Sequence, residues 1–308
     1  MQSTTTTVTA TDGTALFTHR WLPDADPKAV LVLAHGMAEH SARYARLAEA
    51  LTAAGYAVYA PDHRGHGRTA DEKDHGYFAD SGGWETVVGD LRQVTDFARS
   101  EHPGLPVFLL GHSMGSFLAR AFVIGGSEHL TGLVLSGTAG DPGALGKVGA
   151  GIAAAEARVR GRRHVSPLLD KLTFGQYNAA FKPNRTDFDW LSRDDAEVDA
   201  YVADPLCGNT FTSGFFADLL GGLAGINDAK QVAGVRKTLP VLLVAGDKDP
   251  VGAGGKGPRA VAQQYREAGL TDVTCTIYPG ARHEVFNETN RDEVTADVVR
   301  WLDAHLPG

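Results

Sequence analysis

The stretch Gly111-His112-Ser113-Met114-Gly115 constrains this chain most, because it separates an apolar run at 106–110 from a helical apolar pattern at 117–124. The first run predicts a buried strand and the second a helix. A serine in the sharp turn between such elements is the context of a nucleophile elbow. The turn is strained, and a side chain at either flanking glycine would collide with neighbouring backbone. The pattern therefore indicates Ser113 as a candidate nucleophile.

The pentapeptide alone is also compatible with a plain glycine-rich loop, since the chain contains 37 glycines. A serine hydroxyl is a poor nucleophile at neutral pH and needs three further components. These are a general base, an acid that orients the base, and donors for the developing oxyanion. The nucleophile hypothesis therefore depends on finding them elsewhere in the chain.

Strand and helix patterns alternate on both sides of the serine turn. Residues 5–21 alternate apolar and polar around Asp12-Gly13, which predicts a β-hairpin. Apolar runs at 29–34 and 56–60 flank a helical stretch at 44–54, which predicts a parallel crossover. Further elements are expected as a helix at 84–97, strands at 133–135, 241–245 and 273–278, a helix at 259–268, and a last helix capped by Asn290 with Glu293 three residues later.

The alternation breaks down between about residues 141 and 237, where alanine-rich basic, aromatic and apolar stretches follow one another. We therefore expect an α/β fold with a mostly parallel central sheet flanked by helices. Its core is predicted to comprise residues 1–140 and 238–308. Residues 141–237 are predicted to form a helical cap, or lid, inserted into that core.

Composition excludes several classes of function. With 43% hydrophobic and 21% charged residues and a net charge of -8, the chain is typical of a soluble globular protein, and nucleic acid is not expected as a partner. No apolar run is long enough for a transmembrane segment, and no basic-then-apolar leader is visible. Cys207 and Cys275 are far apart, which indicates neither a disulfide framework nor a thiolate metal site. We expect a cytoplasmic protein; its oligomeric state and any role of the two cysteines stay open.

The general base is expected near the carboxyl end of a late strand, where active sites of open parallel sheets collect. His283 follows the strand at 273–278 by a short turn, and is the candidate base. His305 falls in the last turn of the final helix, and we expect it to be solvated there.

The orienting acid is expected in the loop Gly246-Asp247-Lys248-Asp249-Pro250, after the strand at 241–245. Asp249 is favoured because it lies deeper in the loop and precedes a stiffening proline. Asp247 is expected to cap or solvate the turn, and Asp141, after the preceding strand, is the alternative acid. The order Ser, Asp, His agrees with the elbow class.

The oxyanion hole requires two backbone N–H groups. One comes from the residue after the nucleophile, here Met114. The second is expected from the first strand-to-helix loop, where His35-Gly36-Met37 stands, and is assigned to Met37.

Taken together, five motifs resemble the monoacylglycerol lipase and lysophospholipase-like group of α/β-hydrolases, over nearly the whole chain. They are His35-Gly36-Met37-Ala38-Glu39-His40-Ser41-Ala42-Arg43-Tyr44, Asp62-His63-Arg64-Gly65-His66-Gly67-Arg68, Gly111 to Gly115, Gly246 to Pro250, and His283-Glu284.

The resemblance implies an α/β-hydrolase fold and a serine esterase or lipase acting on monoacylglycerols, lysophospholipids or similar small acyl esters through an acyl-enzyme, without metal or cofactor. By position, Ser113, Asp249 and His283 would be the triad, and Met37 and Met114 the oxyanion donors. Glu39, Arg43 and residues 62–68 would support the surrounding loops. Ser116 departs from the glycine usual in the group, and the insertion is not securely matched to a cap sequence of the group, which leaves the substrate open.

Several features have two interpretations. Phe211, Phe215 and Phe216 suit an acyl-binding face, and equally suit packing of the cap on the core. His63 and His66 near Asp62 suggest metal ligands, but the glycines around them favour a tight turn, and no metal site is expected.

Other functions remain open on the same scaffold: thioesterase, carbon–carbon bond hydrolase, aminopeptidase or a non-catalytic ligand-binding protein. Aminopeptidase activity would require acidic residues to hold a substrate amine, and Asp194, Asp195 and Glu197 in the insertion keep it open. The complete triad argues against a pure binding role.

Overall fold

The computed structural model describes residues 1–307 and contains one sheet of eight strands in the order β1-β2-β4-β3-β5-β6-β7-β8. β1 and β2 form the predicted hairpin, and the remaining strands run parallel to one another. This mostly parallel sheet confirms the predicted fold class. The strands are β1 (Gln2–Thr9), β2 (Ala15–Leu22), β3 (Ala29–Ala34), β4 (Tyr56–Pro61), β5 (Val107–His112), β6 (Gly132–Ser136), β7 (Val241–Gly246) and β8 (Val273–Tyr278).

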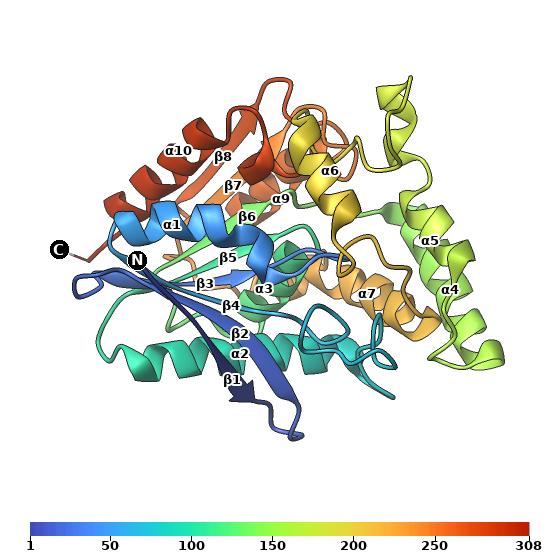
Figure 1. Ribbon diagram of the computed structural model, residues 1–308, viewed down its shortest axis with the longest axis horizontal. Helices are drawn as coiled ribbons and strands as arrows, with labels where there is room; N and C mark the ends of the chain where they lie inside the picture. Colours follow the sequence, from blue (N-terminus) through green and yellow to red (C-terminus); the bar gives the residue numbers. More distant parts are fainter. Residues whose placement is uncertain (308) are drawn as a thin grey trace.

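Helices cover both faces of the sheet (Figure 1). α1 (Ala45–Ala53) and α10 (Arg291–Ala304) pack on one face, while α2 (Gly83–Glu101), α3 (Met114–Ile124) and α9 (Lys256–Glu267) pack on the other. The central strands are buried on both sides, so they read as continuous apolar runs rather than as alternating patterns.

Five helices lie between β6 and β7, within the predicted cap. In Figure 1, α4, α5 and α6 gather at the end of the molecule opposite the two termini. α7 contacts α4 and also α2 and α3, so the insertion shares a continuous interface with the core. The cap boundaries stay a prediction. The helices are α4 (Gly143–Arg160), α5 (Pro167–Phe174), α6 (Asp195–Ala203), α7 (Ser213–Ile226) and α8 (Ala229–Val232).

Two local expectations at the C-terminal end are wrong. Asn290 does occupy the N-cap of α10, but its side chain does not cap the helix. Its amide donates instead to Glu293 Oε2, at 2.9 Å. His305 is not simply solvated, because its Nε2 lies 3.0 Å from the Asp272 carboxylate. Asn290 thus bonds the side chain of Glu293 instead of the helix backbone, and Asp272, the partner of His305, is too distant along the chain for local sequence to reveal it.

Within residues 1–307, no helix has both the length and the apolar character needed to cross a membrane.

Candidate active site

Ser113 occupies the predicted turn between β5 and α3, with a left-handed φ of 52°. A Cβ added at Gly115 would overlap the carbonyl oxygen of Ala34, and one added at Gly111 would lie 2.8 Å from Ser116 Cα. Backbone atoms cannot move aside as a flexible side chain can, so both glycines are required by the close approach of the chain. The turn therefore presents Ser113 at the carboxyl edge of the sheet.

His283 and Asp249 meet at the same edge. His283 Nδ1 lies 2.9 Å from Asp249 Oδ1, and both side chains are buried. The Val251 N–H donates to the same oxygen at 2.8 Å, which fixes the carboxylate. The structure thus places Asp249, rather than an alternative acid, beside the histidine.

The two alternative acids have other partners. Asp247 accepts a hydrogen bond from the Gly280 N–H at 2.7 Å, so it caps the neighbouring turn after β8 rather than its own turn. Asp141 is exposed at the start of α4 and accepts from the Gly143 N–H at 2.8 Å.

The surroundings of His283 favour its protonated form. Burial lowers the pKa of His283, but the Asp249 carboxylate, its hydrogen bond and the nearby Glu284 and Glu39 outweigh that effect, so the pKa lies above its ordinary value. The rings of His112 and Trp190 pack against the imidazole of His283, at centroid distances of 4.7 and 5.1 Å. Neither ring was predicted to contact His283, and no spacing pattern in the sequence points to Trp190, which lies in the predicted cap.

The loop after β3 lies against the serine turn. A Cβ added at Gly36 would be 3.2 Å from Ser113 Cβ. The Gly36 N–H donates to Glu39 Oε1 at 2.6 Å, whereas the next N–H, that of Met37, has no acceptor among the hydrogen bonds of residues 1–307. The Met114 N–H, at the first position of α3, likewise has none within that part of the chain. Both predicted oxyanion donors are therefore free to bind an acceptor.

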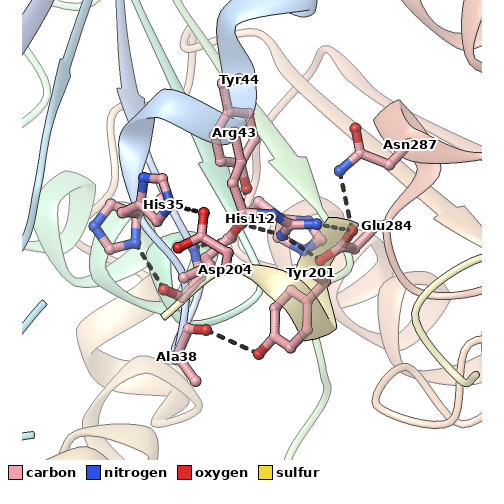
Figure 2. Close-up of polar contacts among 12 residues, drawn as sticks. His35, Ala38, Arg43, Tyr44, His112, Tyr201, Asp204, Glu284 and Asn287 are labelled. Carbon is pink, nitrogen blue, oxygen red and sulfur yellow. Dashed lines mark hydrogen bonds and ion pairs between the residues drawn. The ribbon is translucent and has the colours of Figure 1, made fainter. Parts of the chain in front are cut away.

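Arg43 connects this loop to the loop of His283 (Figure 2). Its guanidinium donates to Glu39 Oε2 at 2.6 Å, and to both carboxylate oxygens of Glu284 at 2.6 and 2.8 Å. Burial raises the pKa of Glu39 despite Arg43, while Arg43 overcomes the burial of Glu284 and lowers its pKa to about 2. The buried guanidinium of Arg43 thus forms ion pairs with two buried carboxylates, those of Glu39 and Glu284. The resemblance indicated Glu39 and Arg43 as supports, but not the bridge to Glu284.

We call the loop after β3, which carries Met37, the oxyanion loop. The predicted cap contacts it through Ala38, which has a left-handed φ of 59°. Figure 2 shows the Tyr201 hydroxyl directed at the Ala38 carbonyl, at 2.8 Å, and the Gly208 N–H donates to the same oxygen at 3.0 Å. Two donors from the cap therefore hold the strained residue that follows Met37.

These groups open into one cleft with about 590 Å³ of empty space, part of it open to solvent. Ser113 and His283 form its floor, and Phe174, Trp190 and Leu191 from the cap form an apolar wall. Asp170 of α5 also lines the cleft, and burial raises its pKa. Sequence reasoning missed Asp170, since an isolated acid in a cap helix carries no motif.

Phe211, Phe215 and Phe216 do not line this cleft as far as residues 1–307 show, so their predicted role in substrate binding is not supported. All three are buried, and Phe211 and Phe215 pack on the ring of His66 at 4.8 and 5.9 Å. They fit the alternative role instead, because they anchor α7 and the turn at its N-terminus on the core. Their apolar face packs against loops that cover the sheet, and not against the cleft.

The eight-stranded sheet, the serine turn and the buried His–Asp pair define the class of the protein as an α/β-hydrolase of the serine type. The family model described as "Serine aminopeptidase, S33" matches residues 25–290, and the chain belongs to this family.

Curated relatives share most of the chain. A monoacylglycerol lipase of Mycolicibacterium smegmatis is 35% identical over 291 residues, covering 93% of this chain and 92% of that protein. The monoglyceride lipase of Homo sapiens is 32% identical, covering 95% and 86%. Among solved structures, a carboxyl esterase from Bacillus coagulans in complex with glycerol superposes with a TM-score of 0.92 at 28% identity, covering 99% of both chains. These relatives identify the protein as an ester-hydrolysing serine hydrolase.

Proposed function

We propose that the protein hydrolyses monoacylglycerols or similar small acyl esters through an acyl-enzyme on Ser113. The observation that carries this proposal is the pairing of His283 with Asp249 at 2.9 Å, in a cleft that Ser113 also lines. The monoacylglycerol lipase and monoglyceride lipase to which the chain is similar support the substrate class.

We infer the reaction from the roles assigned to these residues. Ser113 Oγ attacks the ester carbonyl carbon while its proton passes to His283 Nε2, and Asp249 stabilises the resulting imidazolium. The carbonyl oxygen becomes an oxyanion that accepts hydrogen bonds from the Met37 and Met114 N–H groups, each worth on the order of 100- to 1000-fold in rate. The carbon–oxygen bond to the alcohol breaks, and His283 returns the proton to the leaving alkoxide. Water repeats these steps on the acyl-enzyme and releases the acid.

The cleft also suits an ester whose alcohol carries hydroxyl groups. The apolar cap wall accommodates a hydrocarbon chain, and the partly buried carboxyl group of Asp170 lines the same cleft. A glycerol hydroxyl would donate a hydrogen bond to this carboxyl group. A cytoplasmic location belongs to the same proposal and is supported by Cys207 and Cys275, which are both free thiols.

Aminopeptidase activity is the second candidate, because of the family description. The acids that kept it open are neutralised by arginines. Asp194 pairs with Arg291 at 2.7 Å, and Glu197 pairs with Arg46 at 2.7 Å. Asp195 lies 3.4 Å from the Arg185 guanidinium. None of the three lines the cleft within the described residues, which favours ester over peptide substrates.

The test is hydrolysis of a p-nitrophenyl ester and of a panel in which acyl length and alcohol vary separately. Ser113→Ala should abolish nearly all turnover without altering the fold. Asp249→Asn should reduce kcat on the order of 10,000-fold, whereas Asp141→Asn should leave it unchanged. A larger loss at Asp141, or full activity of Ser113→Ala, contradicts the mechanism. Faster cleavage of aminoacyl amides than of esters would instead favour the peptidase.

A further inference from the structure

His40, Asp204 and Cys207 lie together where the cap meets the oxyanion loop, and neither the triad nor the cleft uses them. One imidazole nitrogen, one carboxylate oxygen and the Cys207 sulfur all lie within 4.8 Å of one another. Among residues 1–307, this is the only group of three or more such side chains with that spacing. Sequence spacing did not indicate it, because His40 is 164 residues from Asp204.

The backbone holds the two cap ligands on the same side of one turn. Asp204 and Cys207 follow α6, and the Cys207 N–H donates to the Asp204 carbonyl at 3.0 Å. The Leu206 N–H donates to Asp204 Oδ1 at 2.9 Å, which leaves Oδ2 directed at His40 Nε2, at 2.8 Å. The side chains are therefore arranged before any ligand arrives.

We propose that His40, Asp204 and Cys207 form a binding site for one zinc-class divalent cation, which would join the cap to the oxyanion loop. Thiolate, imidazole and carboxylate are the ligand types that Zn²⁺ combines in tetrahedral sites. The fourth ligand is a water molecule that enters beside Asp204, whose side chain is 30% exposed, while that of His40 is 10% exposed.

The geometry requires only a small adjustment. Zinc-to-ligand bonds of about 2.0 to 2.3 Å place tetrahedral ligand atoms roughly 3.3 to 3.8 Å apart. His40 Nε2 and Asp204 Oδ2, now hydrogen bonded, must separate by about 0.5 Å, and the widest pair must close by roughly 1 to 1.5 Å. Side-chain rotation supplies movements of that size without shifting the turn.

Charge also favours the ion. Binding displaces the thiol proton, so a thiolate and a carboxylate neutralise Zn²⁺ and no net charge is buried. The thiol faces Arg43 as well as Glu39, Glu284 and Asp204, so the charged groups around it carry a net negative charge. Zn²⁺ must displace the thiol proton of Cys207, so binding weakens as the pH falls.

The ion would act on the residues that position the oxyanion donor. His40 lies three residues after Met37, and Gly208, next to Cys207, donates to the Ala38 carbonyl. A metal bridge across this junction should raise the thermal unfolding midpoint of the protein, because it stabilises only the folded state.

The test is a competition titration of chelator-stripped, full-length protein with Zn²⁺ and a chromophoric chelator. Wild type should bind one Zn²⁺ per chain. Cys207→Ser, Asp204→Asn and His40→Asn should each weaken binding on the order of 10- to 100-fold or more. Cys275→Ser and His305→Asn are the matched controls and should bind as wild type does. Mg²⁺ should not compete, because it prefers oxygen ligands.

Cd²⁺ supplies an independent readout, and its first arm uses wild type alone. Cd²⁺ added to wild type should produce the ultraviolet charge-transfer absorption of a cadmium thiolate, and Cys207→Ser should lose it while Cys275→Ser keeps it. Absence of that band in wild type, or stoichiometric Zn²⁺ binding that survives Cys207→Ser, overturns the proposal. The three residues would then be a hydrogen-bonded His–Asp pair with a buried thiol packed beside it.

Discussion

Replacing Arg43 by methionine should destabilise the protein strongly, because Arg43 is the counter-charge for two buried carboxylates. Glu39 and Glu284 are 2% and 5% exposed, and both contact the guanidinium. Methionine keeps most of the aliphatic part of the arginine side chain and removes its positive charge. Breaking a buried ion pair by removing one partner costs about 3 to 5 kcal/mol in free energy of unfolding. Arg43→Met leaves two buried carboxylates without a counter-charge, so its cost should lie at the upper end of that range.

The measurement is urea-induced unfolding, compared with Arg300→Met as the control. Arg300 also pairs with a carboxylate, that of Asp297 at 2.8 Å, but its side chain is 75% exposed, so its loss should cost less than about 1 kcal/mol.

Two further results distinguish stranded charge from lost packing. Adding Glu39→Gln and Glu284→Gln to Arg43→Met should recover part of the lost stability, since no buried charge is then unpaired. The deficit of Arg43→Met should also shrink at mildly acidic pH, where the stranded carboxylates take up protons. An Arg43→Met cost as small as that of Arg300→Met, independent of pH, would refute the reasoning.

Three further predictions test the elbow, the buried histidines and the cleft. Gly115→Ala should lower the free energy of unfolding by about 1 to 3 kcal/mol or more and reduce esterase activity, because the added Cβ overlaps backbone atoms. Gly89→Ala in α2 is the control, since the space around its added Cβ is open, and it should raise the free energy of unfolding by about 0.5 to 1 kcal/mol. Urea-induced unfolding measures both changes. Burial lowers the pKa of His66 to about 3. Below about pH 6.5 the unfolded state therefore binds a proton at this residue that the folded state does not, and the free energy of unfolding decreases as the pH falls. His66→Gln should flatten that dependence in unfolding measured across the acidic range, and an unchanged slope would contradict it. Asp170→Asn should reduce kcat/KM for a monoacylglycerol more than for the methyl ester of the same acid, and equal losses would exclude a contact with the glycerol hydroxyls.

The fold followed from local patterns because a sheet buried on both faces needs continuous apolar runs. The run at 29–34 coincides with β3 and the run at 241–245 falls within β7, and both strands are buried throughout. The candidate triad could be proposed in the same way, since Ser113, Asp249 and His283 each follow a strand whose carboxyl end lies at one edge of the sheet. The loops that follow these strands therefore come together at that edge, whatever sequence separates them along the chain.

The cap and the buried polar contacts could not be predicted in this way. Arg43 and Glu284 are 241 residues apart, and no periodic pattern reports such a pairing. Trp190 and Asp170 reach the cleft through the path of the cap, which depends on tertiary packing. The two interpretations of Phe211 could not be separated for the same reason, because an apolar helix face looks identical in sequence whether it meets a substrate or the core.

Active-site labelling tests the central claim most directly. Intact protein should react with a fluorophosphonate, and peptide mass spectrometry should place the adduct on Ser113 alone. Labelling should be lost in Ser113→Ala and strongly slowed in Asp249→Asn, and it should slow as the pH falls through the raised pKa of His283, because protonation removes the base. An unlabelled wild-type protein, or an adduct on another residue, would contradict the account.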